Sequence, residues 1–231
     1  MNDYSTLTRY LGVLPLLAVF FCLSVSSVSA ADIGTVTRLS GEARVLSADG
    51  KTRTLRQGSA ISPGDMAITG KDSRLDIRFS DESLVQLKPE SRFRIDEYAY
   101  RGKPDGNEKG LFSLIKGGFR TITGMIGRIN KNAYAVTTPT ATIGIRGTEY
   151  TATLNKNKGL RVGVARGEVV LANNAGAFSV SEGQSAYVGN ANTAPVYLQS
   201  AGSSQGRGAN AGAASSVQIK GNTRLDARTS G

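Results

Sequence analysis

Histidine is absent from this 231-residue sequence and cysteine occurs only once, and both shortages limit the chemistry open to the chain. Without histidine, the usual general base and the commonest metal ligand are missing, and a Ser-His-Asp triad cannot form. The one cysteine, Cys22, lies in an apolar segment near the N-terminus. If that segment is removed on export, no thiol remains for a disulfide, a zinc-thiolate site or a nucleophile.

The remaining catalytic option is a pair of carboxylates, as in glycosidases. The acidic residues are scattered, however, and most stand beside Lys or Arg in alternating stretches, which is typical of a solvated face. Asp96 and Glu97 are adjacent, so on a strand they would point to opposite faces. The sequence also has no glycine-rich phosphate loop between a strand pattern and a helix pattern. We therefore predict a protein that is not an enzyme and holds no cofactor or metal.

The N-terminal segment has the pattern of a secretory signal. Polar residues up to Arg9 precede an apolar run over residues 11–25, and residues 28–30 (Val-Ser-Ala) are small. This pattern predicts a signal peptide over residues 1–30, cleavage before Ala31, and a periplasmic or secreted mature chain with no stable membrane span. The alternative is a transmembrane anchor, which would need about 20 apolar residues and therefore a longer run.

The formal net charge of +10 at pH 7 favours acidic partners. Anionic polysaccharide, lipid headgroups and nucleic acid all have the required charge, but an exported chain would not meet intracellular nucleic acid. A basic protein without any specific acidic ligand is the simpler interpretation of the same charge, and it stays open.

The segment from residue 33 to residue 188 has the pattern of an all-β domain. Apolar and charged residues alternate in short runs, as in residues 74–79 (Arg-Leu-Asp-Ile-Arg-Phe), and turn signals interrupt the runs every eight to twelve residues. The best helical candidate, residues 111–129, contains four glycines, each of which would weaken a helix by about 1 kcal/mol. We therefore predict two strands there, at residues 111–115 and 119–123.

An internal echo suggests how these strands are organised. Residues 41–60 and 167–186 each have a Gly-Glu start, a strand pattern, a tight turn and a glycine corner at nearly the same spacing. Such repeats favour twisted, solenoid-like coils that bury a shared core, although two copies can also arise from unrelated hairpins. We place this domain at residues 31–190.

The composition changes after the domain. Residues 191–231 form a low-complexity tail that is rich in Gly, Ala, Ser and Asn and poor in large apolar side chains. Such a segment buries too little surface to offset its ordering entropy. We expect residues 200–231 to be disordered and dispensable for folding.

The most specific segment is residues 137–150, TTPTATIGIRGTEY. Pro139 removes a ladder donor, and the glycines on either side of Arg146 permit backbone conformations closed to other residues. In one interpretation Arg146 pins a tight corner by donating to turn carbonyls or to Glu149. In the other, Arg146 faces a ligand.

This segment resembles the signature of the FecR domain family, in which Thr-Pro is followed by an apolar stretch and Arg-Gly-Thr. The residues that carry the resemblance, and that are the candidate structural or binding residues, are Thr138, Pro139, Gly144, Arg146, Gly147, Thr148 and Glu149. The resemblance extends to further segments, namely residues 57–70, 74–84, 116–120 and 167–184, although Glu82 stands where glycine is more usual.

The resemblance implies an all-β domain of solenoid-like coils. Members of the family include the periplasmic halves of anti-sigma regulators that sense occupied outer-membrane transporters. This chain departs from that plan, because only ten residues precede its apolar run and a low-complexity tail follows the domain. We therefore expect an exported binding module that contacts an envelope protein or an anionic cell-surface polymer. The alternatives are a periplasmic component of a sigma/anti-sigma type signalling pathway and a carbohydrate-active enzyme that uses carboxylates.

Overall fold

The computed structural model describes residues 32–198, and nearly all of this segment is β-structure. Sixteen strands in the described residues join into one sheet. Their bounds are β1 Gly34–Ser40, β2 Ala43–Leu46, β3 Thr52–Thr54, β4 Ala60–Ile61, β5 Met66–Thr69, β6 Arg74–Phe79, β7 Leu84–Leu87, β8 Arg92–Ala99, β9 Lys109–Lys116, β10 Gly118–Ile122, β11 Tyr134–Thr137, β12 Thr142–Leu154, β13 Leu160–Asn173, β14 Gly176–Ser181, β15 Ser185–Val188 and β16 Val196–Leu198. A short helix, α1 (Met125–Ile129), and a 3-10 turn (Lys131–Ala133) lie between β10 and β11.

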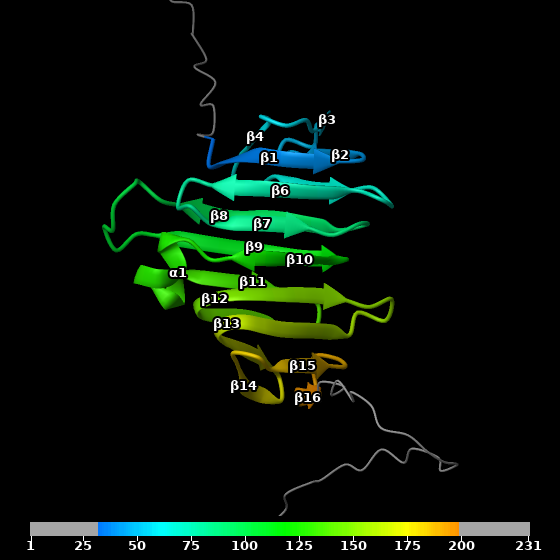
Figure 1. Cartoon of the computed structure of the whole chain (residues 1–231), viewed down its shortest axis with the longest axis vertical. Helices are drawn as coiled ribbons and strands as arrows, with labels where there is room; N and C mark the ends of the chain where they lie inside the picture. The colour runs from blue at the N-terminus through cyan, green and yellow to red at the C-terminus, as the bar shows by residue number, and fades with distance from the viewer. Residues whose placement is uncertain (1–31, 199–231) are drawn as a thin grey trace, which may run out of the picture. The chain divides into compact units, whose positions relative to one another are not determined.

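The sheet is curled over on itself. Its hydrogen-bonded order is β3-β2-β5-β8-β9-β11-β12-β10-β7-β6-β1-β4, and β13 to β16 continue from β12. All neighbours are antiparallel except β9 and β11. The fold-over occurs in β12, whose first residues pair with β11 and whose later residues pair with β10. Figure 1 shows the strands stacked from β1 at one end to β16 at the other.

The core lies inside the curl and is built on a chain of aromatic rings. Ring contacts with centroids 5.2 to 5.6 Å apart connect the buried residues Tyr98, Phe79, Phe112, Phe93, Phe119 and Tyr150. These contacts join β6 to β8 and β9, and β8 to β10, so strands that are not neighbours in the sheet face each other across the core. The contacts supply both buried apolar area and specific ring geometry.

Tight corners carry the chain from one part of the curl to the other. At Gly117, between β9 and β10, φ is +78°, and a Cβ would stand 2.6 Å from Ser91 Cα. Only glycine meets both constraints. The Ser91 hydroxyl then spans the corner, donating to the Gly118 carbonyl (2.8 Å) and accepting from the Gly118 N–H (2.9 Å).

A buried carboxylate anchors α1 to the sheet. Asp81, in the β6–β7 turn, accepts hydrogen bonds from the Ser83 hydroxyl (2.6 Å), the Tyr98 hydroxyl (3.0 Å) and the Ile126 N–H (3.3 Å). Its carbonyl accepts from the Met125 N–H (2.8 Å). These bonds satisfy a carboxylate that is only 2% exposed and fix where the helix begins.

The predicted all-β class is confirmed, but the regular coils of a solenoid are not. β6 covers the predicted residues 74–79, and β9 and β10 lie at the two strands predicted within residues 111–129. The last part of that segment, residues 125–129, is helical instead, because the Asp81 bonds hold a turn that its glycines alone disfavour.

The predicted limits of the signal peptide and of the C-terminal tail are not tested by the structure. The proposed signal peptide over residues 1–30 and residues 199–231 of the tail lie outside the described residues. The structure places one further strand, β16, after the predicted domain end at residue 190. Within residues 32–198, no helix combines the length and apolarity that a bilayer crossing requires.

Candidate functional site

The signature segment forms a turn and the first half of β12. Thr138 shapes the turn: its hydroxyl donates to the Ala141 carbonyl (2.7 Å) and accepts from the N–H groups of Thr140 (3.2 Å) and Ala141 (3.0 Å). Pro139 lies inside this turn, where no ladder donor is needed. Gly144 lies opposite Ala135 on one side and Val170 on the other. These residues therefore position the start of β12.

The second half of the signature is the place where β12 changes partners. The register between β12 and β13 shifts between Arg146 and Glu149, and Gly147 has φ of +60°. Thr148 is buried beside Thr123, whose hydroxyl donates to the Thr148 carbonyl (2.9 Å) and accepts from the Thr148 N–H (2.9 Å). This bulge tightens the bend that folds the sheet over.

Arg146 does not have the partner that the sequence suggested. Its guanidinium is 58% exposed and its ion pair is with Glu168, at 3.5 Å. The carboxylate of Glu149 instead accepts a hydrogen bond from Arg120. The bulge explains the difference, because Arg146 precedes it and lies opposite Glu168 of β13, whereas Glu149 follows it and lies opposite Ile122 of β10. Arg146 instead lines an open hollow of about 600 Å³ together with Lys131 and Tyr134.

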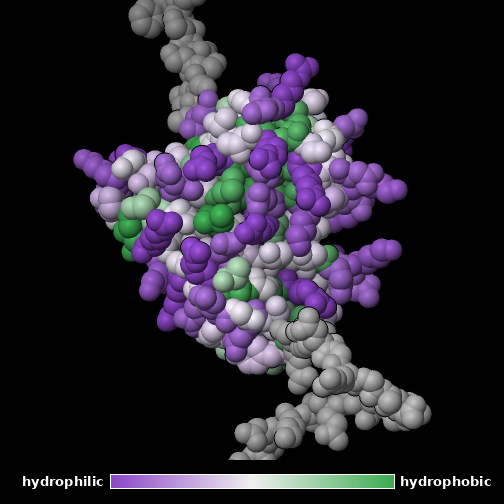
Figure 2. All heavy atoms as spheres, viewed as in Figure 1, coloured by the Kyte–Doolittle hydropathy of each residue, from purple (hydrophilic) through white to green (hydrophobic). Residues whose placement is uncertain are grey.

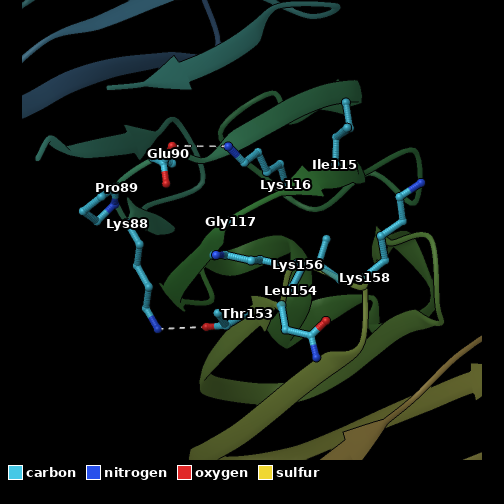
Figure 3. A pocket seen from close by; sticks show the side chains of 12 residues that line it. Lys88, Pro89, Glu90, Ile115, Lys116, Gly117, Thr153, Leu154, Lys156 and Lys158 are labelled. Atoms are coloured by element: carbon cyan, nitrogen blue, oxygen red, sulfur yellow. Dashed lines mark hydrogen bonds and ion pairs between the residues drawn. The ribbon is translucent and has the colours of Figure 1, made fainter. Parts of the chain in front are cut away.

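A second hollow, of about 520 Å³, is more strongly basic, and we call it the lysine hollow (Figure 3). Three segments far apart in sequence meet there: the turn between β7 and β8, the β9–β10 corner, and the end of β12 with the loop that follows. Its lining residues are Lys88, Pro89, Glu90, Ile115, Lys116, Gly117, Gly118, Thr153, Leu154, Asn155, Lys156 and Lys158. Four cations thus share the hollow with one carboxylate.

Lys88 is the most enclosed of the four lysines. Its ammonium group donates to the Thr153 hydroxyl at 2.9 Å, and the side chain is half-buried. Loss of hydration lowers the pKa of Lys88, since burial disfavours the charged form. Among residues 32–198, no carboxylate lies within 4 Å of this ammonium group. An anionic group entering the hollow would supply the missing counter-charge.

The loop that carries Lys156 and Lys158 is held in place by Asn155. The Asn155 side-chain oxygen accepts from the N–H groups of Asn157 (2.9 Å) and Gly159 (2.8 Å), and the backbone N–H of Asn155 donates to the Gly159 carbonyl (2.9 Å). Lys158 has φ of +62°, which this bonding supports. In Figure 3 the Lys156 side chain reaches back toward Gly117. The loop therefore presents its lysines from a defined backbone.

The sequence indicated some of the residues that line the lysine hollow, but not that the three segments carrying them lie side by side. The segment that resembles the family at residues 116–120 contains Lys116, Gly117 and Gly118. No sequence pattern marks Lys88 or Lys156 as a binding residue. Charged residues beside turns are usually solvated, and no periodicity relates three turns that only the curled sheet brings together. The available signal was the lysine-turn-lysine pattern of residues 156–158.

Comparison with known proteins gives one family match, over residues 65–170. Residues 65–170 match the family model described as FecR protein, and this range contains all seven signature residues. No curated protein matches the chain. Within residues 32–198, no group of three or more His, Cys, Asp and Glu side chains is placed to hold a metal ion.

Among solved structures, two of a candidate anti-sigma factor from Parabacteroides distasonis resemble the chain at 15% identity, with TM-scores of 0.47 and 0.46. Each alignment covers 58% of this chain and 58% of that protein. A cell surface anchoring domain is 32% identical over 27% of this chain and 83% of its own length, with a TM-score of 0.27. At these TM-scores, none of the three assigns a function to the chain.

Proposed function

We propose, from the match of residues 65–170 to the FecR family model, that the chain is an exported module that binds an anionic polymer of the cell envelope and catalyses no reaction. The observation that carries the proposal is the lysine hollow, where four lysines face one glutamate. The formal net charge of +10 would attract a polyanion from a distance. The absence of histidine from the whole chain supports the non-enzymatic part of the proposal.

The binding proposal is tested by retention of the exported chain on immobilised polysaccharides at physiological ionic strength. We expect retention on an acidic polysaccharide such as polygalacturonate, none on neutral dextran, and weakening as salt rises because exposed charges are screened. Equal passage through both columns would overturn the proposal. Saturable binding to a purified envelope protein, with no polysaccharide retention, would favour the protein-partner alternative instead.

A second candidate is a periplasmic component of a cell-surface signalling pathway, and the FecR match favours it. In that case the domain would contact a protein partner, and its loss would change transcription rather than surface retention. Deletion of the gene followed by measurement of sigma-factor-dependent transcripts separates the two candidates. Unchanged transcripts together with polysaccharide binding would exclude the signalling candidate and support polymer binding.

A further inference from the structure

The lysine hollow combines an apolar surface with cations, as a binding site for an acidic sugar requires. Ile115 is 38% exposed, and the exposed Pro89 and the largely buried Leu154 also line the hollow. Ligand sites are commonly apolar surfaces with a few polar groups that fix orientation. A sugar ring presents C–H groups to such a surface while its acidic substituent reaches the lysines.

The lysines that line the hollow outnumber its carboxylates. Glu90 pairs with Lys116 at 3.4 Å, which accounts for the one carboxylate that lines it. Over the described range 32–198, Lys88, Lys156 and Lys158 have no carboxylate within 4 Å. Three cations therefore stay uncompensated around one concave surface. A compact oxyanion is the complement that such point charges favour.

The backbone of the hollow is already fixed. The Ser91 bonds hold the Gly117–Gly118 corner, and the Asn155 bonds hold the loop on the other side. The Lys88 side chain is held by Thr153. Binding to a preorganised site loses little conformational entropy, so modest contacts suffice for measurable affinity.

The lining residues favour a saccharide over a nucleic acid. Single strands are usually held by aromatic side chains on which the bases stack, and no aromatic residue lines the lysine hollow. The Thr153 hydroxyl oxygen accepts from Lys88, so its hydrogen can still be donated to a sugar hydroxyl. Figure 2 shows hydrophilic side chains projecting along the edge of the sheet where the β12–β13 loop lies.

We infer that the lysine hollow is the subsite for one oxyanion-bearing sugar residue of the polymer, a uronate or a sugar phosphate, with Lys88 and Lys156 contacting the oxyanion and Ile115 the ring. The inference rests on the proposed function and adds the residues and the ligand class. The oxyanion would take the place of water at the Lys88 ammonium group and restore its counter-charge.

The experiment measures binding of trigalacturonate and of glucose 1-phosphate by calorimetry, using the exported full chain. The test variant is Lys88→Gln with Lys156→Gln, which replaces both ammonium groups by neutral polar amides. The matched control is Lys51→Gln with Lys103→Gln, which removes the same net charge from exposed loops outside the hollow. We expect the dissociation constant to rise about tenfold or more in the test variant, from two lost charge-assisted bonds, and less than about twofold in the control.

The two ligands distinguish the two sources of the oxyanion, and binding of either supports the inference. A second variant, Ile115→Ser, keeps every charge and should weaken trigalacturonate by about threefold to tenfold, because the ring loses its apolar contact. Equal weakening in the test and control variants would overturn the inference, because it would show that net charge alone drives binding. Polymer retention that survives the test variant would refute the subsite and leave the proposed function standing. Tighter binding of single-stranded DNA than of either saccharide would overturn the ligand class.

Discussion

At the scale of single residues, the glycines differ sharply in whether their backbone conformation and surroundings tolerate a side chain. Gly117 has φ of +78° and would place a Cβ 2.6 Å from Ser91 Cα, whereas a Cβ at Gly144 would meet only Val170 O, at 3.8 Å. Gly144 belongs to the signature segment and Gly117 to the lysine hollow. The structure therefore ranks the corner glycine above the signature glycine for stability.

We expect Gly117→Ala to lower the free energy of unfolding by about 2 kcal/mol or more, because strained backbone and steric conflict add. Gly144→Ala is the control and should change the free energy of unfolding by less than about 1 kcal/mol. Urea unfolding followed by circular dichroism measures both. Equal stability of the two variants would show that the corner relaxes without cost.

Arg146 is the residue for which the structure changes the expected result. Because its guanidinium is exposed and forms one ion pair with Glu168, Arg146→Ala should lower the free energy of unfolding by only about 0.2–1 kcal/mol. Thermal melts of Arg146→Ala and Arg146→Lys should both lie close to wild type. A large loss in either variant would return Arg146 to the buried-corner interpretation of the signature.

At the scale of elements, the β6–β7 turn has Glu82 where the family more usually has glycine, and we expect this residue to lower the stability of the fold. Glu82 has φ of +70° in this turn, a conformation that favours glycine, and its side chain is 78% exposed. Its only ion pair in the described residues is a long one, to Arg78 at 3.6 Å. The flanking Asp81 bonds keep the turn closed whichever residue stands between them.

We therefore expect Glu82→Gly to stabilise the protein by about 0.5–1 kcal/mol, since relief of backbone strain outweighs the added flexibility of the unfolded chain. Glu82→Ala removes the same ion pair while keeping the strain, so it should not stabilise. Differential scanning calorimetry of the two variants decides the matter. A lower melting temperature for Glu82→Gly would show that the Arg78 pair contributes more than its geometry suggests.

Strands and many of their local turns were predictable, whereas contacts between distant segments were not. Residues 74–79 alternate cleanly, so their strand follows from the period of side chains alone. The helix α1 depends on Asp81, which lies 45 residues before Ile126 in the chain, and no local pattern reports such a bond. The signature segment was recognised from its residues. The Arg146 partner depended on the register of β12 against β13, and the lysine hollow depended on how distant turns meet.

At the scale of the whole molecule, the core contains hydroxyl groups that must stay protonated. Tyr134 and Tyr150 are buried with their hydroxyl oxygens 3.4 Å apart. Desolvation raises the pKa of Tyr134 to about 12 and raises the pKa of Tyr150 well above its usual value. Both groups therefore hold their protons more tightly in the folded chain than in the unfolded chain.

The sign of the pH effect follows from this difference. Below pH of about 10 both states are protonated and the stability is complete. Between pH of about 10 and 12 the unfolded chain loses protons that the folded chain keeps, so stability falls as pH rises. We expect alkaline unfolding in this window, and Tyr134→Phe should move its midpoint upward. Circular dichroism that stays unchanged up to pH of about 12 would contradict the prediction.

The pairing of β12 with three other strands affects how the chain reaches its final form. β12 is hydrogen-bonded to β10, β11 and β13, so without it the strands before it form two separate ladders, one from β3 to β11 and one from β10 to β4. If the chain folds from its N-terminus onward, the aromatic core would stay accessible to solvent until β12, residues 142–154, pairs with both ladders. We therefore expect a truncation before residue 142 to leave two unjoined ladders with open strand edges, which favour aggregation over a smaller stable domain.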